Sequence, residues 1–203
     1  MSKTDSELML EFQENGNEEA FEQIVRRHRQ PLLNFFYRLT WDRQLAEDCC
    51  QEVFCRLYKY RKSYVPSAKL STFLYRIGKN LWIDRYRSHK NEPDKFSLDA
   101  NVGESDRSFG KFIEGESQDP SHRPEIRDEF ERVMEALDSL APALRETLIL
   151  VKYQGLKYSE AAEVLDVPIG TVRSRIHAAI EQLRTRLNVE QEKTVTSPRQ
   201  NDE

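Results

Sequence analysis

A short run of arginine, hydroxyl and histidine side chains near the C-terminus has the chemistry needed to contact DNA. On a helix that turns about 100° per residue, Ser174 and His177 lie opposite an apolar stripe, and Thr171, Arg173 and Arg175 lie on its flanks. Guanidinium groups pair with guanine edges or phosphates in a major groove, and small side chains between them permit close approach. These residues are therefore predicted to contact duplex DNA.

Two helices and a tight turn are predicted to position these side chains. Ser159 is the expected N-cap of the first helix, which stops at Asp166 because Pro168 disfavours helical geometry in Val167 and can itself begin the second helix. The stripe predicted to be buried is Val172, Ile176, Ala179, Ile180, Leu183 and Leu187. The pattern is typical of a helix-turn-helix, although an amphipathic hairpin in an ordinary helical bundle would share it.

The composition is that of a very polar chain. With 203 residues, 33% of them charged, it has the length of one large or two small domains. There is no apolar run of the ~18 residues that a membrane span needs and no stretch resembling a signal peptide. A cytoplasmic protein is expected.

The net charge of −4 hides a strongly basic block. From position 56 to 90, ten Lys and Arg residues face only Asp84, which gives 10 − 1 = +9. Local patches of this kind, rather than the total charge, set the field that a phosphate backbone meets. The aromatic residues interleaved with these cations could stack on unpaired bases; they are Tyr64, Phe73, Tyr75, Trp82 and Tyr86. Of these, Phe73 is assigned to packing and the others are undecided.

The predicted helix over 42–60 contains all three cysteines and a polar strip. The spacing of Cys49, Cys50 and Cys55 does not let two thiolates share a metal from one face, so no metal site is expected. No phosphate-binding loop and no nucleophile with a base at motif spacing is present, so neither a cofactor nor catalysis is expected. The outward strip contains Asp48, Gln51 and Glu52, and it fits a solvated face as well as a docking surface.

The periodicity predicts an all-α protein with two small helical domains joined by a linker. Residues 1–90 form the first domain, in which Pro31 is expected to kink or divide a long helix. Residues 91–124 are rich in Asn, Asp, Ser, Gly and Pro and form the linker. Residues 125–187 form the second domain, and the polar tail 188–203 is predicted to be disordered.

Two unrelated motif sets occur in a definite order in this chain. DCCQEVFCRLYKY at 48–60 is followed by LSTFLYRIGKNLWIDRYR at 70–87, and then by LAPALRETLILVKYQGLKYSEAAEVLDVPIGTVRSRIHAA at 140–179. In this order they closely resemble the extracytoplasmic-function (group IV) sigma factors of bacterial RNA polymerase.

The resemblance implies a role for each motif. Residues matching the segment that docks on core RNA polymerase are Asp48, Gln51, Glu52 and Phe54. Residues matching the part that recognises the −10 element and captures a flipped base are Lys62, Tyr64, Arg76, Lys79, Asn80, Asp84 and Arg87. Residues matching the −35 reader are Thr171, Arg173, Ser174, Arg175 and His177.

The resemblance also implies what the protein is not and which partners it has. It implies a non-enzyme that lends promoter recognition and melting to the polymerase, and an anti-sigma factor, often membrane-anchored, that holds it inactive. Two other readings of the residues remain open: a stand-alone helix-turn-helix regulator and a helical adaptor without a DNA role.

Overall fold

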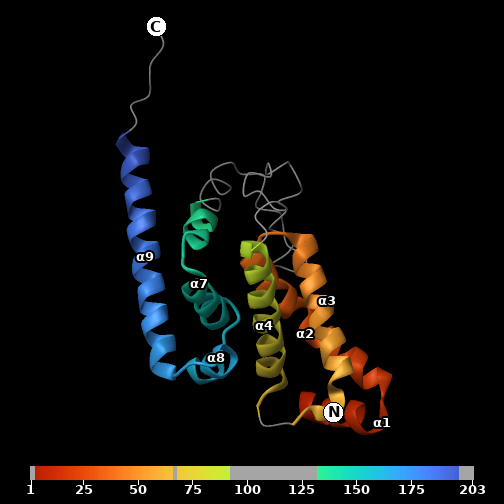
Figure 1. Cartoon of the computed structure of the whole chain (residues 1–203). Coiled ribbons are helices and arrows are strands. Elements are labelled where there is room, and N and C mark those ends of the chain that lie inside the picture. Colours follow the sequence, from red (N-terminus) through yellow and green to blue (C-terminus); the bar gives the residue numbers. More distant parts are fainter. Residues whose placement is uncertain (1–2, 66–67, 92–131, 197–203) are drawn as a thin grey trace.

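The computed structural model describes residues 3–65, 68–91 and 132–196, with side chains described up to 85 in the second range and up to 187 in the third. Every regular element in these ranges is a helix, as the all-α prediction requires, and Figure 1 shows their arrangement. The expected linker, 91–124, and the start of the helix expected near Pro124 lie almost entirely outside the described residues.

The first two helices have well-formed ends. α1 (Asp5–Asn15) begins with a reciprocal capping box between Thr4 and Glu7 and ends at Gly16, whose φ of 64° favours glycine. α2 (Glu18–Thr40) begins with Asn17, whose side chain accepts hydrogen bonds from the N–H groups of the first turn. Pro31 lies inside α2, which continues through it as one helix.

α3 (Arg43–Lys59) and α4 (Leu70–Asn91) complete the N-terminal half. The short η1 helix (Arg61–Ser63) follows α3 and leads toward α4. α4 crosses α2 closely because Gly78 has no side chain: a Cβ there would lie 3.0 Å from Cζ of Phe36. The core of this half consists largely of fully buried side chains, among them Leu8, Met9, Phe12, Ile24, Phe35, Phe36, Val53 and Leu74.

The C-terminal half contains a described helical segment at 132–138, followed by α7 (Pro142–Leu148) and the π-helical turn η3 (Ile149–Tyr153). Gly155 follows η3 with a φ of 70°, a conformation that favours glycine. α8 (Tyr158–Leu165) and α9 (Ile169–Thr196) then form the helix-turn-helix. α9 continues to Thr196, into the tail for which disorder was expected.

Two local predictions about this motif are wrong. Ser159 lies in the first turn of α8 rather than at its N-cap, which is Lys157; there the backbone N–H donates to Glu160 Oε2 at 2.9 Å. Ile180 is 39% exposed, although Val172, Ile176 and Ala179 of the same stripe are buried. Ala179 is fully buried and Leu183, further along α9, still packs partly against the core, so Ile180 lies at the edge of the covered face of the helix.

The two halves pack against each other. The guanidinium of Arg145 on α7 donates to the carbonyl oxygen of Arg38 at the end of α2, with the closer nitrogen at 2.8 Å. Trp41 Nε1 donates to Asp138 Oδ1 at 2.8 Å, and Lys69 pairs with Glu160 at 2.7 Å. α4 lies directly against α8, as Figure 1 shows, so one face of α4 is covered by the C-terminal half.

Candidate nucleic-acid and protein interfaces

The first turns of α9 present the predicted duplex-reading side chains to solvent. The turn before them is set by Asp166, which ends α8 in a left-handed conformation with φ of 56°, and by Pro168, whose carbonyl accepts the N–H of Thr171 at 2.8 Å. Arg173, Ser174 and His177 are exposed, while Val172 on the opposite side is fully buried. This local geometry therefore agrees with a helix whose outward face can enter a groove.

The remaining members of this group are less accessible. Thr171 is half-buried, and its carbonyl accepts the Ser174 hydroxyl at 3.0 Å. Arg175 is half-buried and faces the buried Glu146 of α7. The sequence placed Arg173 and Arg175 alike on the flanks of the helix, but the structure exposes only Arg173.

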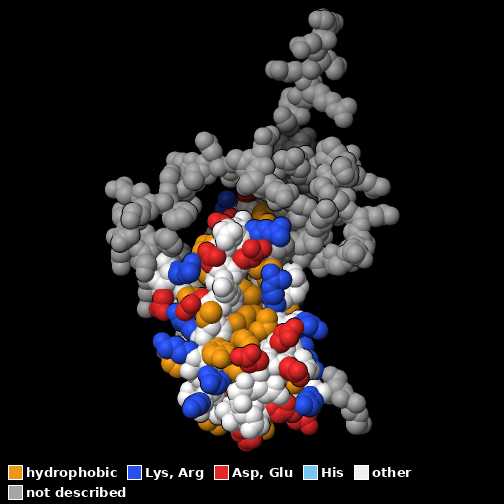
Figure 2. Space-filling model, turned by 90° about the vertical axis from the view of Figure 1, so that its right-hand side faces the viewer, with side chains coloured by type: hydrophobic (Ala, Val, Ile, Leu, Met, Phe, Trp, Pro, Cys, Tyr) orange, Lys and Arg blue, Asp and Glu red, His pale blue; other side chains and the backbone are white. Residues whose placement is uncertain are grey.

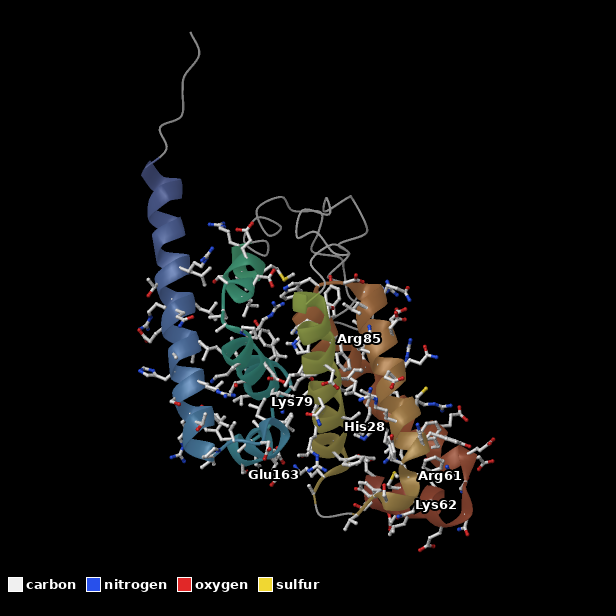
Figure 3. All side chains as sticks on the ribbon, in the orientation of Figure 1. His28, Arg61, Lys62, Lys79, Arg85 and Glu163 are labelled. Carbon is white, nitrogen blue, oxygen red and sulfur yellow. The ribbon has the colours of Figure 1, made fainter. Side chains whose placement is uncertain are left out.

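Glu146 is buried near one residue of each predicted DNA-binding set. It is 6% exposed, and Oε1 has no hydrogen-bond partner within the described part of the chain. Burial raises the pKa of its carboxyl to about 7, while the nearby charges of Lys79 on α4 and Arg175 on α9 act to lower it. A residue from each predicted DNA-binding set therefore lies near the same carboxylate; Figure 3 shows Lys79 on the side of α4 that faces the C-terminal helices.

The predicted −10 residues on α4 divide between two faces. Arg76, Asn80 and Asp84 recur every fourth residue and are exposed, whereas Lys79 is half-buried against the C-terminal half. The Arg76 guanidinium lies over the Phe73 ring, 5.4 Å from its centroid. The side chain of Arg87 lies outside the described residues. An exposed stripe of one cation, one amide and one carboxylate thus runs along α4, and Lys79 is not part of it.

The segment between α3 and α4 holds the other two predicted −10 residues. Lys62 is exposed, but Tyr64 is only 4% exposed, and its ring packs edge-on against Phe73 with centroids 5.2 Å apart. The Tyr64 ring is therefore covered in this structure, and its assignment as a base contact stays a prediction. Tyr75 is also buried, and its hydroxyl donates to Gln154 Oε1 at 2.9 Å. Neither of these two aromatics is available for stacking.

A groove lies on the outer side of α2 and α3. It encloses about 670 Å³, and its lining is mostly apolar; the lining residues are Phe21, Val25, Arg29, Leu33, Glu47, Cys50, Gln51, Phe54, Cys55 and Tyr58. Figure 2 shows uncovered apolar side chains at the centre of the corresponding face, with acidic and basic side chains around them. We call this feature the α2/α3 groove.

The predicted polymerase-docking residues lie in or beside this groove. Gln51 and Phe54 line it, whereas Asp48 and Glu52 do not. Asp48 is exposed and accepts from Gln44 at 3.2 Å, and Glu52 pairs with Arg56 at 2.7 Å. On α3 the lining residues Glu47, Gln51, Phe54 and Tyr58 recur every three or four positions, so a helical face was readable in the sequence. The α2 side of the groove was not readable in the sequence, because it depends on how α2 and α3 pack.

The three cysteines of α3 differ in exposure. Cys49 and Cys50 are buried and Cys55 is exposed, and all three are free thiols. Burial raises the pKa of both buried thiols, that of Cys50 to about 11, which disfavours the reactive thiolate. Within the described ranges, no three His, Cys, Asp or Glu side chains cluster as metal ligands, and no helix has the length and apolar character of a membrane span.

Comparison with known proteins accounts for both halves of this arrangement. Residues 24–92 match the family model described as Sigma-70 region 2, and residues 130–183 match Sigma-70, region 4. The chain is 33% identical over 173 residues to the ECF RNA polymerase sigma factor SigW of Bacillus subtilis, covering 85% of this chain and 91% of the relative. The chain belongs to the extracytoplasmic-function sigma factors. A second relative, the RNA polymerase sigma-H factor of Pseudomonas aeruginosa, is 29% identical over 90% of this chain and 94% of its own.

Solved structures agree with the fold of this sigma factor. CnrH, in a complex with the cytosolic domain of CnrY, superimposes with a TM-score of 0.67 at 24% identity, covering 92% of this chain and 99% of CnrH. The sigma factor RpoE of Bartonella quintana, solved with the anti-sigma factor NepR, gives 0.63 at 25% identity over 83% of this chain and 97% of its own. We refer below to the N-terminal half as region 2 and the C-terminal half as region 4.

Proposed function

We propose that this sigma factor binds core RNA polymerase and directs promoter recognition and DNA melting when transcription begins. Region 2 would dock on the polymerase and read the −10 element, and region 4 would read the −35 element. The observation that carries the proposal is that an open apolar groove lies in region 2 beside the polar strip Asp48, Gln51 and Glu52, on the face away from region 4. Chemistry stays with the polymerase, and this chain contributes binding only.

The α2/α3 groove has the character of a site for a partner helix. An amphipathic helix binds in a groove by burying an apolar face and meeting polar groups at the rim. Phe54 and Leu33 contribute to the apolar lining. Arg29, Glu47 and Gln51 supply a cation, a carboxylate and an amide. We assign the α2/α3 groove to the polymerase.

Reading both promoter elements requires regions 2 and 4 to separate. Two duplex elements that lie one and a half helical turns apart are separated by about 50 Å. In the structure, Lys79 of α4 and Arg175 of α9 both lie near Glu146, and α4 packs on α8. The closed arrangement cannot place both reading surfaces on such a promoter together, and it fits the form that an anti-sigma factor would hold.

Transcription by core polymerase on a library of random upstream sequences tests the function. We expect enrichment of two short motifs at a fixed spacing, found only when this protein is added. Selection of a single duplex site without any transcript would instead favour a stand-alone helix-turn-helix regulator. That alternative explains region 4 but leaves the match of residues 24–92 without a role.

The docking surface has its own test. Replacing Gln51 and Cys55 by arginine introduces charge and bulk into the groove, and we expect core-polymerase affinity to fall by at least tenfold. Asp48→Ala with Glu52→Ala removes the adjacent carboxylates and tests the strip apart from the groove. The matched control is Glu135→Ala with Glu163→Ala, which removes two exposed carboxylates from region 4. Unchanged affinity in both region 2 variants would refute this docking site.

A further inference from the structure

The first helix of the chain holds the segment that precedes α4. The side-chain amide of Gln13 on α1 lies 3.0 Å from the carbonyl oxygen of Lys62 and 3.0 Å from that of Tyr64. An amide NH₂ has two donor hydrogens, so one side chain can satisfy both carbonyls. These bonds join parts of the chain 49 and 51 residues apart. α1 lies outside the residues that match Sigma-70 region 2, which begin at 24.

α1 is itself firmly anchored. Leu8, Met9 and Phe12 are fully buried, and the Phe12 ring stacks on Phe21 of α2 at 4.7 Å between centroids. At its first turn, Asp5 accepts from Arg27 at 2.9 Å and contacts His28 at 2.8 Å. Figure 3 shows Arg61 and Lys62 at the α1 end of region 2, and the Arg61 guanidinium lies 5.5 Å from the Phe12 ring centroid. Gln13 therefore acts from a fixed support.

The two hydrogen bonds set which side chains of residues 62–65 face outward. With both carbonyls held toward α1, Tyr64 turns inward against Phe73, while Lys62 is exposed and Val65 is 70% exposed. A flipped base is held between aromatic or apolar side chains, and a lysine beside it can meet the phosphate backbone. Rotation of residues 62–65 about the chain axis would expose Tyr64 and turn Lys62 or Val65 inward.

We propose that Gln13 is a positioning residue for −10 recognition, holding residues 62–65 in the register that presents Lys62 and Val65 to an unpaired strand. The proposal rests on the assignment of region 2 to the −10 element. Gln13 does not itself touch DNA; it acts through two backbone carbonyls. Discrimination among −10 sequences then depends on a residue outside the matched region.

The test compares variants of Gln13 in the full-length protein with core polymerase. Gln13→Met keeps the length and removes the donors; Gln13→Glu keeps the shape and places a carboxylate against two carbonyls; Gln13→Lys keeps donors. Gln23→Met, an exposed glutamine on α2, is the matched control. The readouts are the rate of promoter opening, the preference between promoters that differ by one −10 base, the core-polymerase affinity and the melting temperature.

We expect Gln13→Met and Gln13→Glu to lower the opening rate about tenfold, equivalent to one or two ordinary hydrogen bonds, and to reduce the −10 preference. Gln13→Lys and Gln23→Met should behave like the parent. On a template already unpaired at −10, the variants should recover transcription but not base preference.

Two results would overturn the proposal. One is an unchanged opening rate and base preference in Gln13→Met and Gln13→Glu. The other is a fall in opening rate that is accompanied by a fall in core-polymerase affinity and in melting temperature, with the −10 preference unchanged. Gln13 would then support the fold rather than −10 recognition. If the parent protein supports no transcription at all, the proposed function fails instead, and this outcome is visible before any variant is compared.

Discussion

Regions 2 and 4 present their candidate DNA surfaces in different ways. In region 4, Arg173, Ser174 and His177 come from adjacent turns of α9 and face solvent. In region 2, the surface combines α4 with residues 62–65, which α1 supports through Gln13, and Lys79 is half-buried at the contact with region 4. A surface built on one helix is fixed by local periodicity, whereas one assembled from several elements depends on their packing.

The largest expected effect is a loss of stability in region 2 alone, when its core is disrupted. Phe36 is fully buried and lies against Gly78, so Phe36→Ala should destabilise region 2 by about 3–5 kcal/mol. Both tryptophans, Trp41 and Trp82, lie in region 2, so fluorescence during urea unfolding reports on this half, while far-ultraviolet circular dichroism reports on both. If Phe36→Ala unfolds at the same urea concentration as the parent by both fluorescence and circular dichroism, Phe36 is not a core residue of region 2.

Opening the contact between the regions should come next in size. Arg145→Ala removes the donors to the Arg38 carbonyl, the ion pair with Asp138 and the contact over the Trp41 ring. Hydrogen bonds from a charged group contribute about 1.5–3 kcal/mol, so the closed form should lose that much relative to an open one. Small-angle scattering should show a larger radius of gyration. Arg184→Ala, an exposed arginine of α9, is the control and should leave the radius unchanged.

Arg173 and Arg175 sharpen the comparison within region 4. Loss of one arginine contact to a base costs about 1–3 kcal/mol, so Arg173→Ala should reduce −35-dependent transcription about 5- to 150-fold without altering core affinity. Arg175→Ala should have the smaller effect, since Arg175 is half-buried near Glu146. Run-off transcription on promoters with and without the selected −35 motif measures both. The reverse order of effects would contradict the exposed face described for α9.

A further expected effect is a pH dependence of stability centred on Glu146. Its pKa is raised from 4.5 to about 7 in the folded protein, first by burial. The folded state binds the Glu146 proton more tightly than the unfolded state does. The contribution of this proton to the free energy of unfolding is therefore fully present below pH ~4.5 and is lost as the pH rises through ~7. Glu146→Gln should flatten the thermal melting temperature over this window. A parent and variant with parallel pH profiles would show that Glu146 titrates normally.

Much of this structure was predictable from local patterns. The helical spans of both regions, the turn at Asp166 to Pro168 and the buried Val172 and Ile176 follow from periodicity and helix-ending residues. The outward positions of Asp48 and Gln51 follow in the same way. The N-cap at Ser159 and the burial of Ile180 were predicted wrongly, because neighbouring elements decide which residue is covered; they also decide that Arg175 is half-buried while Arg173 is exposed.

The sequence by itself determined the helices, the order of the two motif sets and the side chains that each helix displays, because helical periodicity links spacing directly to direction. Only the tertiary structure decided that Tyr64 is buried, that Gln13 reaches the carbonyls of Lys62 and Tyr64, and that Lys79 and Arg175 lie near Glu146. The last two of these facts join residues far apart in the chain. No local pattern encodes such distances, since they arise from how whole helices pack.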